Sequence, residues 1–343
     1  MAGPTVFLRT ALIISVCAFV TACGSRDGNA SNVYGLTAEI RGDSPPERAW
    51  VEAEVDTVAA LSSGEGYTLF KPSTVEFIPD GNIYVYDFGD FTIKAFTAQG
   101  EYVASYGNGR GRGPGQVIGL TDTGLWRDSL IYLVDSRLRR ISFFAKDGDL
   151  VRTENYDHPV WRLDWTDDSI RIATSPSPAA DFIVMEAEGR QISVSQLFMD
   201  NVPSLARAGL LHAGRKKAIY VPRYLPVLLT YSLDDTIGTA YPTPDYGAPR
   251  PETRDYQGGT LAPATEMNGR STLQGGVLTV ERPSSAAGDS VQFDLYDARQ
   301  MTYMHSVRLP IEGKTSRYAY GMDRVVSIRD TTVHLYRVMH PAK

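Results

Sequence analysis

Two stretches of the chain repeat each other: residues 82–103 read NIYVYDFGDFTIKAFTAQGEYV, and residues 130–151 read LIYLVDSRLRRISFFAKDGDLV. Each stretch predicts a strand, an Asp turn, a second strand, a hairpin and a third strand, which together make one antiparallel blade. A single blade cannot bury both of its faces, so such units must stack against one another. The matched pairs all lie at an offset of 48: Tyr84/Tyr132, Asp87/Asp135, Ile93/Ile141, Phe96/Phe144, Gly100/Gly148 and Val103/Val151.

Four later segments repeat the same strand rhythm less closely. They pair residues 169–173 with 182–185, 218–221 with 227–231, 277–280 with 291–296, and 325–328 with 332–336. Long helical periodicity is absent, and residues 204–212 form at most a short helix. We therefore predict an all-β fold, a six-bladed β-propeller over residues 65–340. A spare strand within residues 50–61 should close the ring by completing the last blade, near residues 315–340.

The N-terminus reads as an export signal. Residues 1–22 are MAGPTVFLRTALIISVCAFVTA, with an apolar run of about 12 residues that is too short to span a bilayer comfortably. Val20-Thr21-Ala22-Cys23 resembles the bacterial lipobox, an aliphatic residue and two small residues before a cysteine that takes a diacylglyceryl group. The resemblance implies cleavage before Cys23 and lipidation of its thiol. A plain secretory signal or a short buried helix is the alternative, and Arg9 is the region's single basic residue.

These features divide the chain into a signal peptide (1–22), a flexible tether (23–48) rich in Gly, Ser, Asn, Asp and Pro, and one propeller domain (49–343). Two or more acyl chains hold a protein firmly at a bilayer, so the expected partner is a membrane, reached through lipid. In hosts that retain lipoproteins in the inner membrane through an Asp after the cysteine, Gly24 indicates the outer membrane.

The first two units resemble NHL repeats. Residues 72–73, 80–85 and Asp87 match the first half of that motif, and residues 93–96 and 100–103 match the second half. The Gly-rich stretch 106–117 resembles the junction between two NHL blades. Together with the lipobox, the chain resembles the six-bladed β-propeller lipoproteins of bacteria. That resemblance covers residues 70–155 well, and it implies a fold and a location in the cell envelope more than an activity.

Composition narrows the function classes. The formal net charge is −6, which argues against nucleic acid as a partner because proteins that bind it usually show a basic face. The acidic balance is still compatible with a local basic patch. Both cysteines, Cys17 and Cys23, lie in the first 23 residues. After cleavage no disulfide can form within the chain, and the folded body holds no thiolate for metal binding or catalysis.

Four residues are candidate ligand-binding residues, each with a structural alternative. Asp87 and Asp135 end the second strand of their units, where they could join a carboxylate ring that binds a divalent cation, or accept turn N–H groups. Arg110 and Arg112 lie in GNGRGRGPG (107–115), which could cradle an anion or simply link two blades. We expect both arginines to be exposed.

Other candidates are weaker. Among five histidines, His158 is the metal candidate because it precedes Pro159 near a blade junction. Asp164, Asp167 and Asp168 are interpreted as a solvated acidic turn, and residues 242–263, with no strand pattern, as a lid or insertion.

The sequence therefore favours a lipid-anchored binding or interaction module of the bacterial cell envelope. Its ligand could be an envelope protein, a peptide or a glycan, and no cofactor is expected. The alternative is a metal-dependent propeller hydrolase or lyase, similar to lactonases, with a divalent cation held by residues of several blades.

Overall fold

A computed structural model describes residues 36–340 of the chain, with gaps. The gaps are positions 43, 79, 128, 158 and 322 and segments 167–170, 177–180, 188–189, 198–206, 233–236, 247–252, 257–259, 264–265, 284–289 and 312–316. The signal segment, Cys23 and His158 therefore lie outside the described residues. Within the described part, no helix is long and apolar enough to span a membrane.

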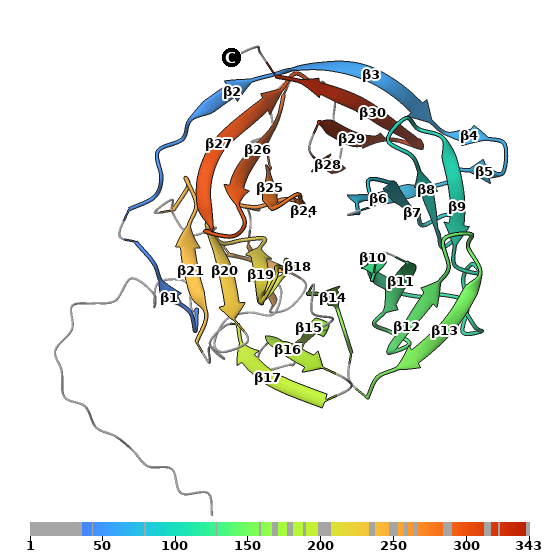
Figure 1. Cartoon of the computed structure of the whole chain (residues 1–343), viewed down its shortest axis with the longest axis horizontal. Coiled ribbons are helices and arrows are strands. Elements are labelled where there is room, and N and C mark those ends of the chain that lie inside the picture. The colour runs from blue at the N-terminus through green and yellow to red at the C-terminus, as the bar shows by residue number, and fades with distance from the viewer. Residues whose placement is uncertain are drawn as a thin grey trace, which may run out of the picture. The chain divides into compact units, whose positions relative to one another are not determined.

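Five blades are each built from four consecutive antiparallel strands, which follow one another around a central axis (Figure 1). Blade 1 consists of β6 (Pro72–Phe77), β7 (Ile83–Asp87), β8 (Thr92–Phe96) and β9 (Tyr102–Tyr106). Blade 2 consists of β10 (Leu120–Trp126), β11 (Leu130–Asp135), β12 (Arg140–Phe144) and β13 (Leu150–Asn155). Blade 3 consists of β14 (Arg162–Trp165), β15 (Arg171–Pro176), β16 (Asp181–Ala187) and β17 (Arg190–Gln196). Blade 4 consists of β18 (Gly209–Ala213), β19 (Lys217–Pro222), β20 (Val227–Ser232) and β21 (Thr239–Pro242), and blade 5 of β24 (Ser271–Gln274), β25 (Val277–Arg282), β26 (Val291–Asp297) and β27 (Thr302–Leu309).

The sheet that closes the ring is composite. Its three consecutive strands are β28 (Arg317–Gly321), β29 (Arg324–Arg329) and β30 (Thr332–Met339). The fourth strand, β3 (Glu54–Leu61), comes from the N-terminal part of the chain and pairs antiparallel with β30, from Glu54↔Met339 to Leu61↔Val333. We call this sheet the closing blade. The all-β propeller class and closure by an N-terminal strand are confirmed: five of the predicted units form blades by themselves, and the sixth needs β3.

Apolar side chains of the second and third strands form the core. The second strand of blade 1, IYVYD, is buried along its whole length, because neighbouring blades cover both of its faces. Six hydrophobic clusters each join two adjacent blades, the last one linking the closing blade to blade 1. The repeats in the sequence are therefore the buried strand pairs β7/β8, β11/β12, β15/β16, β19/β20, β25/β26 and β29/β30.

The turns divide into two sets, because successive strands of a blade run in opposite directions. Turns after the first and third strands lie on one face of the ring, which we call the odd face. Turns after the second strand, and connections from the fourth strand to the next blade, lie on the opposite face, which we call the even face. β4 (Ser63–Gly64) and β5 (Tyr67–Thr68) form a small hairpin in the connection into blade 1.

The N-terminal segment forms a belt over the outer edges of blades 4 and 5 and the closing blade, as Figure 1 shows in blue. β1 (Glu39–Ile40) pairs in parallel with β21, and β2 (Trp50–Glu52) pairs in parallel with β27. Leu36 and Ala38 are each only 2% exposed, packed in the cluster of blades 3 and 4. The prediction of a flexible tether to residue 48 is therefore wrong for residues 36–48, because apolar side chains in a polar stretch dock there.

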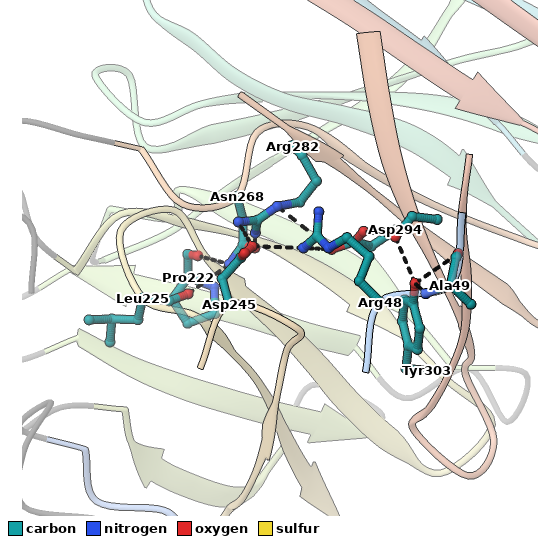
Figure 2. A network of polar contacts seen from close by, with 10 residues as sticks. Arg48, Ala49, Pro222, Leu225, Asp245, Asn268, Arg282, Asp294 and Tyr303 are labelled. Carbon is teal, nitrogen blue, oxygen red and sulfur yellow. Dashed lines mark hydrogen bonds and ion pairs between the residues drawn. The ribbon is translucent and has the colours of Figure 1, made fainter. Parts of the chain in front are cut away.

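Polar contacts anchor the belt between blades 4 and 5 (Figure 2). Arg48 Nη2 lies 2.9 Å from Asp245 Oδ2 and 3.3 Å from Asp294 Oδ2, while Arg282 also contacts both carboxylates. The Asp294 side chain is fully buried and accepts a hydrogen bond from Ser306 Oγ at 2.5 Å. Because a buried carboxylate is costly without partners, the two arginines fix the belt in one position.

Two further local predictions are corrected. Residues 242–263, expected to lack strands, contain the hairpin β22 (Thr253–Tyr256) and β23 (Thr260–Pro263). In the segment 204–212, expected to be at most helical, β18 begins at Gly209 and places His212 in a strand. These three strands are short and lack the continuous apolar run that marks the buried strands, so their sequences carry a weak signal.

We predict that the belt contributes measurably to stability. A chain that begins at residue 46 lacks β1, Leu36 and Ala38, so its free energy of unfolding should fall by about 2 kcal/mol or more relative to a chain that begins at residue 36. Denaturant unfolding of the two chains measures the difference. A third chain that begins at residue 62 lacks β3 and should aggregate through the edge of β30. Equal stability of the first two chains would refute a docked belt.

Candidate functional site: the axial cavity

A cavity of about 400 Å³ lies where the innermost strands meet. Its lining comes from β6, β10, β14, β18 and β24, the first strands of the five consecutive blades, which surround the centre in Figure 1. The lining extends to first-turn residues on the odd face, namely Ile78, Arg127, Thr166 and Gly275. This volume is within the range typical of small-molecule sites.

Two aspartates on neighbouring innermost strands connect their blade to the next one. Asp122 Oδ2 accepts a hydrogen bond from the backbone N–H of Leu163 at 2.6 Å. Asp164 Oδ2 accepts one from the N–H of Ala213 at 2.6 Å, and its Oδ1 accepts one from Trp165 at 2.8 Å. Each aspartate is the third residue of its strand, so equivalent positions perform the same contact.

A histidine and a serine make the next contact around the ring. His212 Nε2 lies 2.7 Å from Ser271 Oγ, which joins β18 of blade 4 to β24 of blade 5. Burial lowers the pKa of His212 to about 4, and the Arg162 guanidinium adds to that effect. The imidazole is therefore neutral at neutral pH, and it can both donate and accept a hydrogen bond.

Two arginines supply the positive charge of the cavity. Arg270 donates from Nη1 to Glu76 Oε1 and from Nη2 to Thr74 Oγ1, each at 3.1 Å, and so links blade 5 to blade 1 past the closing blade. Arg162 instead donates to backbone carbonyls, those of Thr121, Trp161 (3.2 Å) and Gly209 (3.4 Å). Among the described residues, no carboxylate lies within ion-pair distance of Arg162.

Burial raises the pKa of all three carboxyl groups around the cavity. The pKa of Asp164 rises to about 6, and that of Glu76 rises although Arg270 opposes the change. The pKa of Asp122 rises well above its usual value, because burial and the Glu76 charge outweigh the attraction of Arg162. The cavity thus holds carboxyl groups with raised pKa values, a neutral imidazole and a guanidinium, which together present both hydrogen-bond donors and acceptors.

The predicted candidates Asp87 and Asp135 lie elsewhere, on the even face. Both are buried, and their carboxylates cap turns. Asp87 accepts N–H groups of Phe70, Lys71 and Gly89 at 2.7–2.8 Å. Asp135 accepts N–H groups of Ile118, Gly119, Arg137 and Leu138 at 2.6–3.1 Å. The hydrogen bonds correspond to the structural alternative, in which each aspartate fastens the chain entering its blade to its own second turn.

Arg110 and Arg112 also lie on the even face, and both are exposed as expected. The Arg110 guanidinium lies 5.2 Å from the centre of the Phe91 ring. The Arg112 carbonyl accepts a hydrogen bond from Arg140 Nη1 at 3.0 Å. The structure does not bring these arginines together with the axial cavity.

The remaining predictions divide into one correction and four residues outside the described part. Asp164 belongs to the innermost strand β14 rather than to a solvated turn, and its carboxylate binds the next blade. Cys23, His158, Asp167 and Asp168 lie outside the described residues. Within the part of the chain that the structure describes, no group of three His, Cys, Asp or Glu side chains is placed to hold a metal ion.

Sequence reasoning missed most of the cavity residues, namely Glu76, Asp122, Arg162, His212 and Arg270. The available signal was a charged or polar side chain at alternate positions of each unit's first strand, as in Thr74 and Glu76. On an innermost strand, one set of alternate side chains faces the axis. Those strands do not repeat one another in sequence, so no repeated pattern marks their polar residues.

Comparisons with known proteins support the fold. The chain matches no family model and no curated protein sequence. A putative exported protein from Bacteroides fragilis superposes with a TM-score of 0.55 at 10% identity, covering 85% of this chain and 100% of that one. A member of the DUF4221 family from Bacteroides vulgatus has a TM-score of 0.50 at 10% identity, covering 84% and 99%. At such identities the likeness shows a shared β-propeller fold, while the NHL resemblance stays a prediction.

We predict that His212 makes the folded chain less stable in acid. The unfolded imidazole takes up a proton near pH 6.5, whereas the folded one does so only near a pKa of about 4. The contribution of the neutral, buried His212 side chain to the free energy of unfolding is therefore complete above pH 6.5. It is lost as the pH falls toward 4, because the unfolded chain then binds a proton that the folded chain does not. Relative to His212→Gln, the wild type should lose about 2 kcal/mol between neutral pH and about pH 4.5. Urea unfolding at both pH values tests this. Asp164, whose pKa is raised, has the opposite effect on stability as the pH falls, but it is present in both proteins and cancels in the comparison. If the stabilities of the wild type and of His212→Gln change in parallel with pH, the prediction is refuted.

Proposed function

We propose that this chain is an exported, lipid-anchored β-propeller of the bacterial cell envelope that binds a small polar ligand in its axial cavity. The cavity of about 400 Å³, lined by charged and hydrogen-bonding side chains of five blades, is the observation that carries the proposal. A purely structural channel could be filled by apolar side chains, as small closed β folds commonly are.

The state of each polar group supports recognition of a small polar molecule. Arg162 has a guanidinium that is charged and bonded mainly to carbonyl groups, so a carboxylate or hydroxyl of a ligand could approach its remaining N–H groups. The neutral imidazole of His212 can both donate and accept a hydrogen bond, and the Asp122 carboxyl group can accept one. A ligand with several hydroxyl, amide or carboxylate groups fits this lining, which includes small glycans and peptides.

Catalysis is the second function to weigh, since His212 and Ser271 lie at the 2.7 Å spacing of a base and a nucleophile. A base with a pKa of about 4 is poorly matched to neutral pH, because efficient proton transfer needs a pKa near the working pH. The pair is better explained as a contact between blades, and binding is the preferred function. A metal-dependent hydrolase or lyase would need ligands from several blades, and His158 is the proposed candidate among residues that the structure does not describe.

Export and anchoring rest on the sequence. The short apolar run before Cys23 and the Val20–Cys23 lipobox support cleavage and lipidation. A putative exported protein with the same fold is consistent with a place in the envelope. The proposed partners are the membrane, through the lipid, and an envelope protein, a peptide or a glycan.

We expect a cavity ligand to stabilise the chain through Arg162. Thermal unfolding should be followed with glucose, N-acetylglucosamine, glycylglycine, glutamate and succinate as probes. A ligand at about 100 times its Kd adds about 2.7 kcal/mol of stability, which is a readily measured rise in Tm. Arg162→Leu should abolish the rise, whereas Arg308→Leu, at an exposed position on β27, should retain it. A probe that stabilises both variants equally does not bind in the cavity.

We also expect Cys23→Ala to yield an unlipidated protein that leaves the membrane fraction or stays uncleaved in the inner membrane. The wild type should carry an acylated N-terminal cysteine, because the thiol is the acceptor of the diacylglyceryl group. Intact-mass analysis of the purified chain checks this. A mature chain that starts at another residue and bears no lipid would contradict the anchor while leaving the cavity proposal intact.

A further inference from the structure

Basic and aromatic side chains gather on the even face of blades 1 and 2. Phe70 and Phe88 are 58% and 46% exposed, which is unusual for phenylalanine on a folded surface. Exposed cationic side chains surround them along the second turns and the connection between the two blades. We define the basic–aromatic patch as Phe70, Lys71, Phe88, Arg110, Arg112 and Arg137.

Specific contacts hold the blade 1 part of the patch together. The Asp87 carboxylate accepts the N–H groups of both Phe70 and Lys71, which fixes that segment beside the second turn of the blade. Lys71 Nζ lies 5.4 Å from the centre of the Phe88 ring. Phe88 in turn packs against Phe91 at 4.8 Å between ring centres, and Arg110 lies over the other ring of that pair. The patch is therefore continuous from Phe70 to Arg110.

The blade 2 part is joined to it through the Gly-rich connection. Arg140 donates a hydrogen bond to the carbonyl of Arg112, which fixes the backbone of this loop while the Arg112 side chain stays exposed. The Arg137 side chain lies directly against Gly119, where an added Cβ would come within 2.7 Å of its Cγ. The loop thus presents Arg110 and Arg112 next to the second turn of blade 2.

Little negative charge offsets these cations. The carboxylates of Asp87 and Asp135 are buried and bonded to backbone N–H groups, and Asp90 Oδ2 lies 2.5 Å from Lys94 Nζ. Asp157 is the exposed acid at the edge of this area, where its carbonyl accepts from Arg139. A cationic patch on a chain with a net charge of −6 is a local feature and does not follow from composition.

We infer that the basic–aromatic patch docks on the surface of an anionic phospholipid bilayer. Lysine and arginine near such a surface are attracted to its phosphates, and aromatic side chains enter the interface between headgroups and acyl chains. The combination of exposed phenylalanines with cations favours this occupant over a soluble polyanion such as heparin, which has no acyl chains or aromatic rings to contact Phe70 and Phe88. Docking would cover the even face. The odd face, to which the lining of the axial cavity extends, would remain open.

Vesicle co-sedimentation tests the inference independently of the lipid anchor. The protein is the full mature chain with Cys23→Ala, and the vesicles are phosphatidylcholine alone or phosphatidylcholine mixed with phosphatidylglycerol. We expect binding to the mixed vesicles only, weakening as salt is added. The double variant Arg110→Glu with Arg112→Glu should weaken binding by about tenfold or more, since each cation near the surface contributes about a factor of five.

Two further variants make the result specific. The control reverses two exposed cations on the odd face of blade 4, Arg215→Glu with Lys216→Glu, and should bind as the parent does. The variant Phe70→Ser with Phe88→Ser should lose binding severalfold without any change in charge. If the reversed pair folds poorly, Arg110→Gln with Arg112→Gln replaces it. Equal binding to both vesicle types, equal losses in patch and control variants, or capture by heparin without binding to vesicles would each overturn the inference.

Discussion

The pairing of β3 with β30 is the constraint on which the rest of the structure depends. A blade has a sheet edge and two apolar faces, and only a closed ring covers every face with a neighbour. The last three strands leave the edge of β30 open, and an N-terminal strand covers it. The hydrophobic cluster between the closing blade and blade 1 exists because this strand lies in place, with Leu61 of β3 among its members. No covalent link within the described residues shares this task, so hydrogen bonds and side-chain packing hold the ring shut.

Polar groups at the axis serve stability and recognition at once. Asp122 and Asp164 each bind a backbone N–H of the next blade, so their burial is compensated by hydrogen bonds between innermost strands. The same burial raises their pKa values. A residue that ties two blades is thereby also held in one orientation toward a ligand, as a preorganised binding site requires.

The sequence predicts those parts of the structure whose strands carry a repeated pattern, and it does not predict the others. In blades 1 and 2 the second and third strands are buried on both faces, so their apolar runs, such as residues 83–86 and 131–134, recur and reveal the propeller. The sequences of the first strands differ from blade to blade, because each strand contacts different neighbours at the axis. Glu76, Arg162 and His212 were therefore not predicted as cavity residues. The aspartates that did repeat, Asp87 and Asp135, repeat because every blade must fasten the chain that enters it. Leu36 and Ala38 were missed for another reason: two isolated apolar residues in a polar segment do not indicate that β1 pairs with blade 4.

The belt also sets the order in which the molecule would yield to a mechanical pull at its N-terminus. Force applied before residue 36 meets the two-residue pairing of β1 first, then the Arg48 ion pairs, then the three residues of β2. The eight residues of β3 come last, and they alone close the ring. The short outer pairings of β1 and β2 can therefore detach while the ring stays closed. The freed N-terminal segment then lengthens by tens of ångströms, at about 3.3 Å per extended residue. In this arrangement the weaker contacts of the belt break under force before β3, the strand whose loss would unfold the protein.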